Sequence, residues 1–260
     1  MKRKEITFTF LFVLLLTGSC LEGLLCVKGE GNLTEEYRHT ENFTGIANST
    51  SIDVIYRKAD TSGLLLEAEE NLLYYILTEV EGNTLSIRIR EHTACINFTE
   101  KPLITVTSPS INDLVSTGSG NMFLQDITGE AVEIRSSGSG DINCETLDAQ
   151  DLFIKISGSG NINCDETSSL YSEIKISGSG DLSLGGSCNN ADITVSGSGS
   201  IYGISYLLST AGITISGSGN VYTSISDKLT AILTGSGNIY LRGDPEIHKN
   251  VTGSGIIIYY

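Results

Sequence analysis

The tripeptide Gly-Ser-Gly occurs eight times between residues 118 and 255 of this chain, and successive copies begin 18 to 20 residues apart. A repeat this regular is typical of a structural unit that stacks on copies of itself, because one unit cannot bury its apolar face alone. The spacing therefore predicts a solenoid with a glycine corner in every turn. The first glycines of the eight triplets are Gly118, Gly138, Gly158, Gly178, Gly197, Gly217, Gly235 and Gly253.

Alternating apolar residues flank the triplets. In the copy at Gly158, Ile154 and Ile156 precede the glycine by four and two residues, and Ile162 follows it by four. Most other copies are apolar at the same three positions, which predicts one shared core, since alternate residues of a strand point the same way. The Ser or Thr directly before each glycine is expected to face outward. Parallel crossovers are almost always right-handed, so we predict an all-β fold, a right-handed parallel β-helix built as a single-stranded solenoid.

Each predicted corner has two recurring features, the glycines and the polar residue that follows them. The glycines are expected to provide positive φ or close backbone approach. The residue after the second glycine is Asn or Asp in most copies, and Asn161 separates Asp141 from Asp181. This order is typical of a structural ladder that keeps like charges apart. The alternatives are a carboxylate pair for cleaving polysaccharides and a calcium site.

Residues 1–20 have the pattern of an export signal, with a basic start, an apolar core from Phe8 to Leu16 and a small-residue end. The apolar core is too short for a membrane-spanning helix. Cys20 follows Gly-Ser as in a bacterial lipobox, although Thr17 stands where leucine is preferred. We therefore predict a lipid on Cys20 and a place in the cell envelope, as an outer-membrane lipoprotein on its surface or periplasmic face. Secretion without a lipid and an uncleaved anchor are the alternatives.

Charge excludes some partners. The net charge of −15 argues against nucleic acid and against adsorption to anionic lipid, since both need a basic surface. Arg135, Lys155 and Lys175 nevertheless stand at the same place in three successive copies, three residues before the glycine. We interpret them as a solvated strand face with ion pairs, and ligand contact is the alternative.

The rest of the chain divides into unequal parts. Residues 21–36 are expected to be a tether, residues 37–115 an irregular N-terminal β region with the first irregular rungs, and residues 116–260 the repeat. Within the N-terminal region, residues 46–54 resemble a degenerate copy of the repeat, and residues 69–75 suggest a short helical turn. Strand-like runs on both sides of Gly82-Asn83 predict a hairpin.

The cysteines and histidines form no ligand pattern. The chain has six cysteines without CxxC spacing, which argues against zinc. Cys144 and Cys164 would lie one rung apart, near disulfide range, but we favour small buried apolar residues in a ladder. The chain's three histidines, His39, His92 and His248, are scattered. We predict neither a cofactor nor a metal.

Three tyrosines mark a candidate ligand surface. Tyr202, Tyr222 and Tyr240 each lie five residues after a repeat glycine. They are expected to form an exposed stack on consecutive rungs, which favours contact with carbohydrate or protein. The alternative is that they cover the sheet and one another.

Ordered motifs along residues 26–260 resemble one known family. They are CVKGEG (26–31), FTGI (43–46), EENLLYYI (69–76), TEVEGNTL (78–85) and the repeated SGSG followed by Asn or Asp and Ile. This set resembles the putative auto-transporter adhesin head GIN domain family. The resemblance implies an exported protein of Bacteroidota or related bacteria, similar in fold to pectin-lyase-like β-helices but without their catalytic residues. Residues 48–51 depart from the family's Ser-Gly-Ser, which predicts an irregular first rung.

The residues and the resemblance together predict a non-catalytic exported protein of the cell surface or periplasm. Adhesion to carbohydrate or protein is the leading hypothesis. The alternatives are a polysaccharide-active β-helix enzyme, either a lyase or a hydrolase, and a structural envelope protein.

Overall fold

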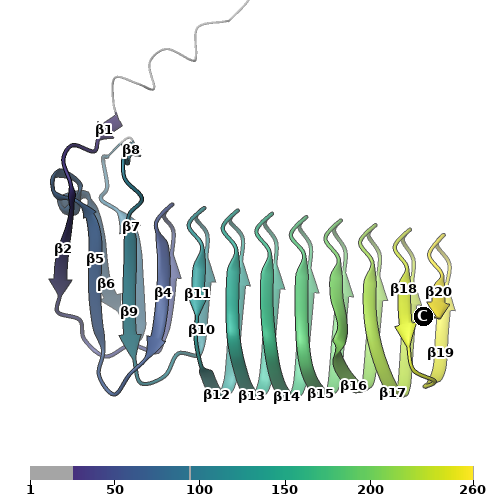
Figure 1. The fold of residues 1–260 in the computed structure, drawn as a ribbon. Coiled ribbons are helices and arrows are strands. Elements are labelled where there is room, and N and C mark those ends of the chain that lie inside the picture. Colours follow the sequence, from purple (N-terminus) through teal and green to yellow (C-terminus); the bar gives the residue numbers. More distant parts are fainter. Residues whose placement is uncertain (1–25, 94, 260) are drawn as a thin grey trace, which may run out of the picture.

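The computed structural model describes residues 26–93 and 95–259, whose strands stack side by side along one axis (Figure 1). Eighteen strands belong to one continuous hydrogen-bonded system. From β10 to β20 all pairings between rungs are parallel, so the prediction of an all-β parallel solenoid is confirmed. The strands of the repeat are β10 (Asp113–Ser116), β11 (Met122–Leu124), β12 (Ile127–Ser136), β13 (Ile142–Ile156), β14 (Ile162–Ile176), β15 (Leu182–Val195), β16 (Ile201–Ile215), β17 (Val221–Leu233), β18 (Ile239–Arg242), β19 (Glu246–Val251) and β20 (Ile257–Tyr259).

The apolar columns of the repeat form the core. Ile154, Ile156 and Ile162 are almost completely buried, and each aligns with its counterpart on the neighbouring rungs. The hydroxyl residues that precede the glycines, such as Ser157, are exposed as expected. Stacking in register therefore places corresponding positions of the repeat on one another from rung to rung.

Most repeat rungs continue from one corner to the next as a single bent strand. β13, β14 and β16 each run for 15 residues from one corner to the next. The chain bends inside these strands without leaving the hydrogen-bonded ladder. Inward-facing residues continue through the bend, as Leu147, Ala149 and Leu152 show in β13. A separate loop is unnecessary because neighbouring rungs pair the backbone on both sides of the bend.

Close backbone approach explains the corner glycines. The N–H groups of Ser159 and Gly160 both donate to the carbonyl oxygen of Gly138 in the preceding rung, at 3.0 and 3.2 Å. A Cβ atom on Gly158 would lie closer than 3.0 Å to that oxygen. The glycines with positive φ in the described chain all lie outside the Gly-Ser-Gly corners. Of the two reasons expected from the sequence, only the close approach applies.

The Asn and Asp column forms a ladder of side-chain hydrogen bonds. The N–H of Asn161 donates to Oδ1 of Asp141 at 2.7 Å, and the N–H of Asp181 donates to Oδ1 of Asn161 at 2.9 Å. The same bond links each rung to the next from Asp53 to Ile256. Any short side chain with an acceptor oxygen fits this position, which explains why Asn, Asp and Ser all occur there.

The degenerate copy of the repeat is a true first rung. β3 (Gly45–Asn48) pairs with β10 and β4 (Asp53–Lys58) pairs with β11, both in parallel. Asn48 closes the corner in place of a glycine triplet. Its Oδ1 accepts the N–H and hydroxyl of Thr50 at 3.0 and 2.8 Å, and its Nδ2 donates to the carbonyl of Ile52 at 2.9 Å. This corner is therefore built differently from the glycine corners of the later rungs.

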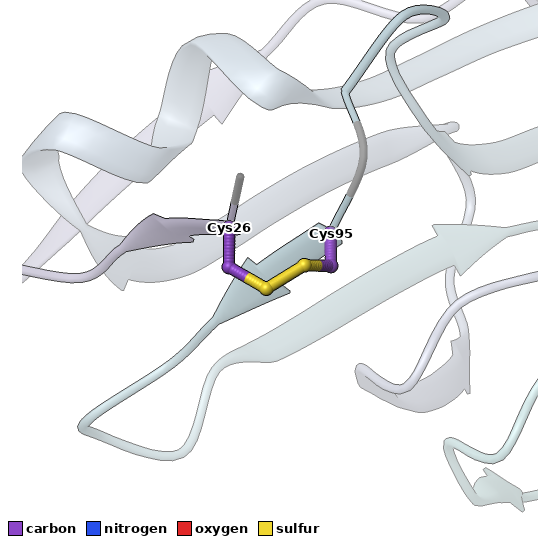
Figure 2. The surroundings of a disulfide bond; sticks show 2 residues. All are labelled: Cys26 and Cys95. Atoms are coloured by element: carbon purple, nitrogen blue, oxygen red, sulfur yellow. A yellow bond between two sulfur atoms is a disulfide. The ribbon is translucent and has the colours of Figure 1, made fainter. Parts of the chain in front are cut away.

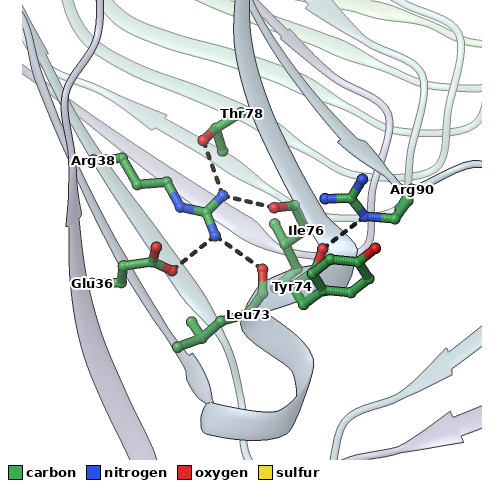
Figure 3. A network of polar contacts seen from close by, with 7 residues as sticks. All are labelled: Glu36, Arg38, Leu73, Tyr74, Ile76, Thr78 and Arg90. Carbon is green, nitrogen blue, oxygen red and sulfur yellow. Dashed lines mark hydrogen bonds and ion pairs between the residues drawn. The ribbon is translucent and has the colours of Figure 1, made fainter.

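Antiparallel strands cap the N-terminal end of the core. β5 (Gly63–Glu69) pairs with both β2 (Leu33–Arg38) and β9 (Leu103–Ser108), and β6 (Ile76–Glu81) and β7 (Thr84–Ile89) form the predicted hairpin. The predicted helical turn is a 3-10 helix over Glu70–Tyr75. Arg38 ties these elements together, since its guanidinium donates to Thr78 and to the carbonyls of Leu73 and Ile76 and pairs with Glu36 (Figure 3).

A disulfide holds the N-terminal strand. β1 (Cys26–Lys28) lies parallel to β8 (Cys95–Asn97), and the Cα atoms of the bonded Cys26 and Cys95 are 4.5 Å apart (Figure 2). Residues 26–36, expected to belong to a tether, therefore contribute β1 and the first part of β2. Pairing with β8 and β5 satisfies their backbone groups, so this part of the expectation is wrong.

Candidate functional site

The three tyrosines stack as the repeat spacing predicts. Tyr202 on β16, Tyr222 on β17 and Tyr240 on β18 pair in register. The ring centroids are 5.2 Å apart in the first pair and 4.4 Å in the second, with interplanar angles of 13° and 7°. The spacing follows from the distance of about 4.8 Å between neighbouring strands. Tyr202 is 46% exposed, and the other two rings are partly exposed.

The stacking geometry determines which parts of the three tyrosine rings a ligand can contact. The middle ring, that of Tyr222, lies between two nearly parallel rings, which cover its faces. Each outer ring, Tyr202 and Tyr240, keeps one face that no tyrosine of the stack covers, and a phenol hydroxyl can both donate and accept a hydrogen bond. The stack therefore presents ring edges along most of its length and an uncovered ring face only at its two ends.

The tyrosine column continues toward the N-terminus with different residues. Ser183, Asn163, Asn143 and Phe123 occupy the same register on the preceding rungs. Nδ2 of Asn163 donates to Oδ1 of Asn143 at 3.0 Å, and the ring of Phe123 is 41% exposed. A shallow hollow of about 290 Å³ lies beside this column. Its walls include Arg57, Phe123, Gln125, Asn143, Glu145 and Asp165.

The Phe123 hollow combines an aromatic ring with planar polar groups, a composition that can contact both the apolar face and the hydroxyl groups of a sugar. It lies on the same face as the tyrosine stack, several rungs away along the axis. Sequence reasoning missed it, although Phe123 also follows its repeat glycine by five residues. Comparing the whole column, and not the tyrosines alone, would have found it.

A second hollow lies where the rungs become shorter. The repeat interval falls from 20 to 18 residues after Gly217, and β16 carries residues 204–206 as an insertion relative to β17. Tyr206 turns inward and its hydroxyl bonds to those of Ser169 and Ser172, both at 2.8 Å. Leu207 is left 58% exposed on the wall of a mainly apolar hollow of about 710 Å³.

The two aspartates considered for catalysis are engaged at the corners. One oxygen of Asp141 accepts the N–H of Asn161, and one of Asp181 accepts the N–H of Ser200, both at 2.7 Å. The structure therefore gives both carboxylates the ladder role that their spacing suggested. Within residues 26–93 and 95–259, no three His, Cys, Asp or Glu side chains are arranged to hold a metal ion.

The repeat cysteines are buried thiols. Cys144 and Cys164 align on neighbouring rungs without a bond between them, which confirms the favoured interpretation. A hydrogen bond with Cys164, together with burial, raises the pKa of Cys144 well above its usual value, so its thiol keeps its proton. The sequence did not single out Cys26 and Cys95. They are the two cysteines that belong neither to a repeat column nor to the export signal, and elimination could have paired them.

Other predicted features lie away from these surfaces or outside the described residues. His248 lies on β19, and its Nε2 is 3.0 Å from Oε1 of Glu246. His39 and His92 belong to the N-terminal cap. Cys20 and the export signal lie outside the described residues. In the part of the chain that the structure describes, no helix is long and apolar enough to cross a membrane.

Comparison with known proteins identifies relatives of this fold. Residues 42–245 match the family model described as "Putative auto-transporter adhesin, head GIN domain". No curated protein matches the chain.

Several solved structures are similar over almost their whole length. A putative adhesin from Parabacteroides merdae superimposes with a TM-score of 0.84 at 23% identity, covering 90% of this chain and 98% of that one. A putative adhesin from Parabacteroides distasonis has a TM-score of 0.84 at 25% identity, with coverage of 90% and 99%. A putative lipid binding protein from the same species has a TM-score of 0.80 at 26% identity, also with coverage of 90% and 99%.

Proposed function

This chain belongs to the putative auto-transporter adhesin, head GIN domain family, and from that membership we propose that it is an exported, non-catalytic binding protein of the cell envelope. Its ligand is a carbohydrate or a protein, as in adhesion. The 25% identity with a putative adhesin of almost the same length supports this proposal. The elongated, rigid and patterned surface of the solenoid also supports it, because a ligand can contact many rungs at once.

We place the contact on the face that carries the tyrosine stack. The observation behind this choice is the run of aligned aromatic, amide and hydroxyl side chains from Phe123 to Tyr240 on consecutive rungs. Aromatic residues with a polar tip supply contact area at low entropic cost and are enriched at binding sites. A ligand on this face would meet the ring of Phe123 at one end and the tyrosine hydroxyls at the other.

Anchoring through Cys20 would complete this function. Six peptide units join Cys20 to the disulfide-bonded Cys26, and a chain of that length spans at most about 22 Å. A lipid on Cys20 would therefore hold the N-terminal cap near the membrane. The repeat rungs would then extend away from the anchored end. Labelling with a radioactive fatty acid, lost in Cys20→Ala, is the corresponding assay.

Binding of a lipid is a second candidate function. The mainly apolar hollow beside Leu207 supports it, with Arg242 on its wall as a cation for an acidic head group. The likeness to a putative lipid binding protein at 26% identity points the same way. An enzyme has no comparable support, since the aspartates that suggested catalysis bond to the backbone at the corners. A purely structural envelope protein has no comparable support either.

Replacing all three stacked tyrosines by phenylalanine is expected to weaken ligand binding by at least about tenfold. The change removes three hydroxyl groups, each worth roughly 0.5–1.5 kcal/mol as a hydrogen-bonding partner, and keeps the stacked rings. A glycan, matrix-protein and lipid array first identifies the ligand, and titration of the best one gives the affinity ratio. Leu207→Ser in the apolar hollow is the matched control.

The array distinguishes the candidate functions. Selective binding of a glycan or protein that the triple phenylalanine variant loses supports the proposal. Binding confined to lipid, and lost in Leu207→Ser, would replace adhesion with the second candidate. A glycan or protein bound equally by the triple variant and the wild type would remove the tyrosine stack from the site.

A further inference from the structure

Three cations stand in a row on the other broad face of the solenoid. Arg135 on β12, Lys155 on β13 and Lys175 on β14 align directly with one another. We call them the basic row. Neighbouring strands are about 4.8 Å apart, and like charges that face each other across strands are destabilising. Aligned cations therefore need nearby carboxylates that offset their mutual repulsion. With a net charge of −15, the chain has an excess of acidic residues.

Two members of the basic row are compensated. Arg135 pairs with Asp113 at 2.7 Å and with Glu133 at 3.0 Å, and Lys175 pairs with Glu173. Both glutamates stand two residues before the cation on the same strand. The middle member, Lys155, is exposed and has no ion pair within the described residues.

The reason for the exception is one substitution within the repeat. Phe153 occupies the position that Glu133 and Glu173 hold on the neighbouring rungs. Its ring is partly exposed, and its centroid lies 6.5 Å from that of Tyr171 in an edge-to-face arrangement. Phe153, Lys155, Lys175 and the two glutamates line a shallow hollow of about 280 Å³. The middle rung therefore pairs an uncompensated ammonium group with an aromatic ring.

We propose that this hollow binds an acidic polysaccharide through a uronic acid residue, whose carboxylate pairs with Lys155 and whose ring packs on Phe153. An ammonium–carboxylate hydrogen bond is stronger than a neutral one, and an aromatic ring covers the apolar face of a sugar. Glu133 and Glu173 flank the hollow and can accept hydrogen bonds from the sugar hydroxyls. The row runs along the solenoid axis, so a linear polymer can follow it.

The charge pattern selects this ligand over other anions. One free cation between two compensated rungs matches a single sugar carboxylate flanked by hydroxyl groups. A nucleic acid has a much denser charge and would be repelled by the flanking glutamates and the net charge of the chain. An acidic peptide without ring side chains, such as poly-glutamate, would satisfy Lys155 but has no ring for Phe153. The inference does not rest on the tyrosine stack, which lies on the strands that follow the corners of later rungs.

The test is binding of the whole protein to polygalacturonate by biolayer interferometry, with heparin as a sulfated polymer, neutral dextran and poly-glutamate alongside. We expect the wild type to bind polygalacturonate and not dextran, and to bind less well as salt rises. Lys155→Glu and Phe153→Ala should each weaken binding by at least about tenfold. Lys155→Arg should retain binding, and Lys249→Glu, an exposed lysine on β19, is the matched charge-reversal control.

Loss of the site can be told apart from loss of the fold, because the Lys155 side chain is exposed and replacing it leaves the core unchanged. Loss of binding in Lys155→Glu but not in Lys249→Glu supports the site, and the heparin arm shows whether sulfate replaces carboxylate. Equal loss in both variants would mean a general charge effect and overturns the proposal. No binding by the wild type, or equal binding of poly-glutamate, overturns it as well. The triple tyrosine variant should bind polygalacturonate like the wild type, so this test is independent of the proposed adhesive site.

Discussion

Gly158→Ala is expected to destabilise the solenoid by about 3 kcal/mol or more, although it adds a single methyl group. The new Cβ would lie closer than 3.0 Å to the carbonyl of Gly138 and to the backbone of Ser137. These atoms cannot move away without breaking the hydrogen bonds that Ser159 and Gly160 donate to that carbonyl. The strain then passes to the neighbouring rungs, because each rung is bonded on both sides.

A glycine in the adjacent rung provides the control for this experiment. Gly129 lies in β12 without positive φ, and a Cβ there would meet its nearest atom at an ordinary 3.4 Å. Gly129→Ala should change the melting temperature little, whereas Gly158→Ala should lower it by several degrees. Thermal unfolding followed by circular dichroism measures both. Equal melting temperatures for the two variants would show that the corners are not packed as described.

Breaking the Cys26–Cys95 disulfide should loosen the N-terminal cap by roughly 2–4 kcal/mol. The two cysteines are 69 residues apart in sequence, so the bond removes much freedom from the unfolded chain. It also holds β1 where Gly29 packs against the buried carboxylate of Glu69. In Cys26→Ser/Cys95→Ser, hydrogen exchange should accelerate in residues 26–38 and 95–108 and stay slow in β13 to β17.

Glu69 adds a pH dependence to the same cap. Its hydrogen bond from the Thr99 hydroxyl lowers the pKa of the carboxyl group below its usual value. A lowered pKa contributes stability above the unfolded value, and this contribution is lost as the pH falls through the folded value. The disulfide variant should lose cap protection at a higher pH than the wild type.

Adding a reductant to the double serine variant is the control and should have no further effect. If reductant leaves the wild-type cap unchanged, the disulfide has no stabilising role.

The register of the solenoid could be predicted because packing fixes the spacing of its glycines. Only a residue without Cβ fits beneath the preceding carbonyl, so the interval between triplets is the length of a turn. The columns of Ile154 and Ile162 then follow from strand alternation. The Asn and Asp ladder was also predictable, since its acceptor oxygens occur at one fixed offset.

The structural features that could not be predicted from the sequence depend on contacts between segments that are far apart in the chain. Cys95 could be assigned to Cys26 only by elimination, and the bond from Asn71 to the carbonyl of Lys28, 43 residues away, has no signal near β1. The bend inside β13 replaces a loop because adjacent rungs pair there, although its sequence varies between copies. The tyrosine stack was expected, but ring orientation decides that it presents edges, and orientation needs coordinates.

Cross-linking between rungs tests the stacking of the corners most directly. Thr194 and Thr214 are paired residues on β15 and β16, and the distance of about 4.8 Å between neighbouring strands lies within disulfide range. In a background without the three buried thiols, Thr194→Cys/Thr214→Cys should form a disulfide on mild oxidation, found by peptide mass spectrometry. Thr194→Cys/Ser216→Cys, shifted by two residues on the same face, should stay reduced. A bond in the shifted pair and none in the matched pair would contradict the stacked register on which the fold and both binding faces depend.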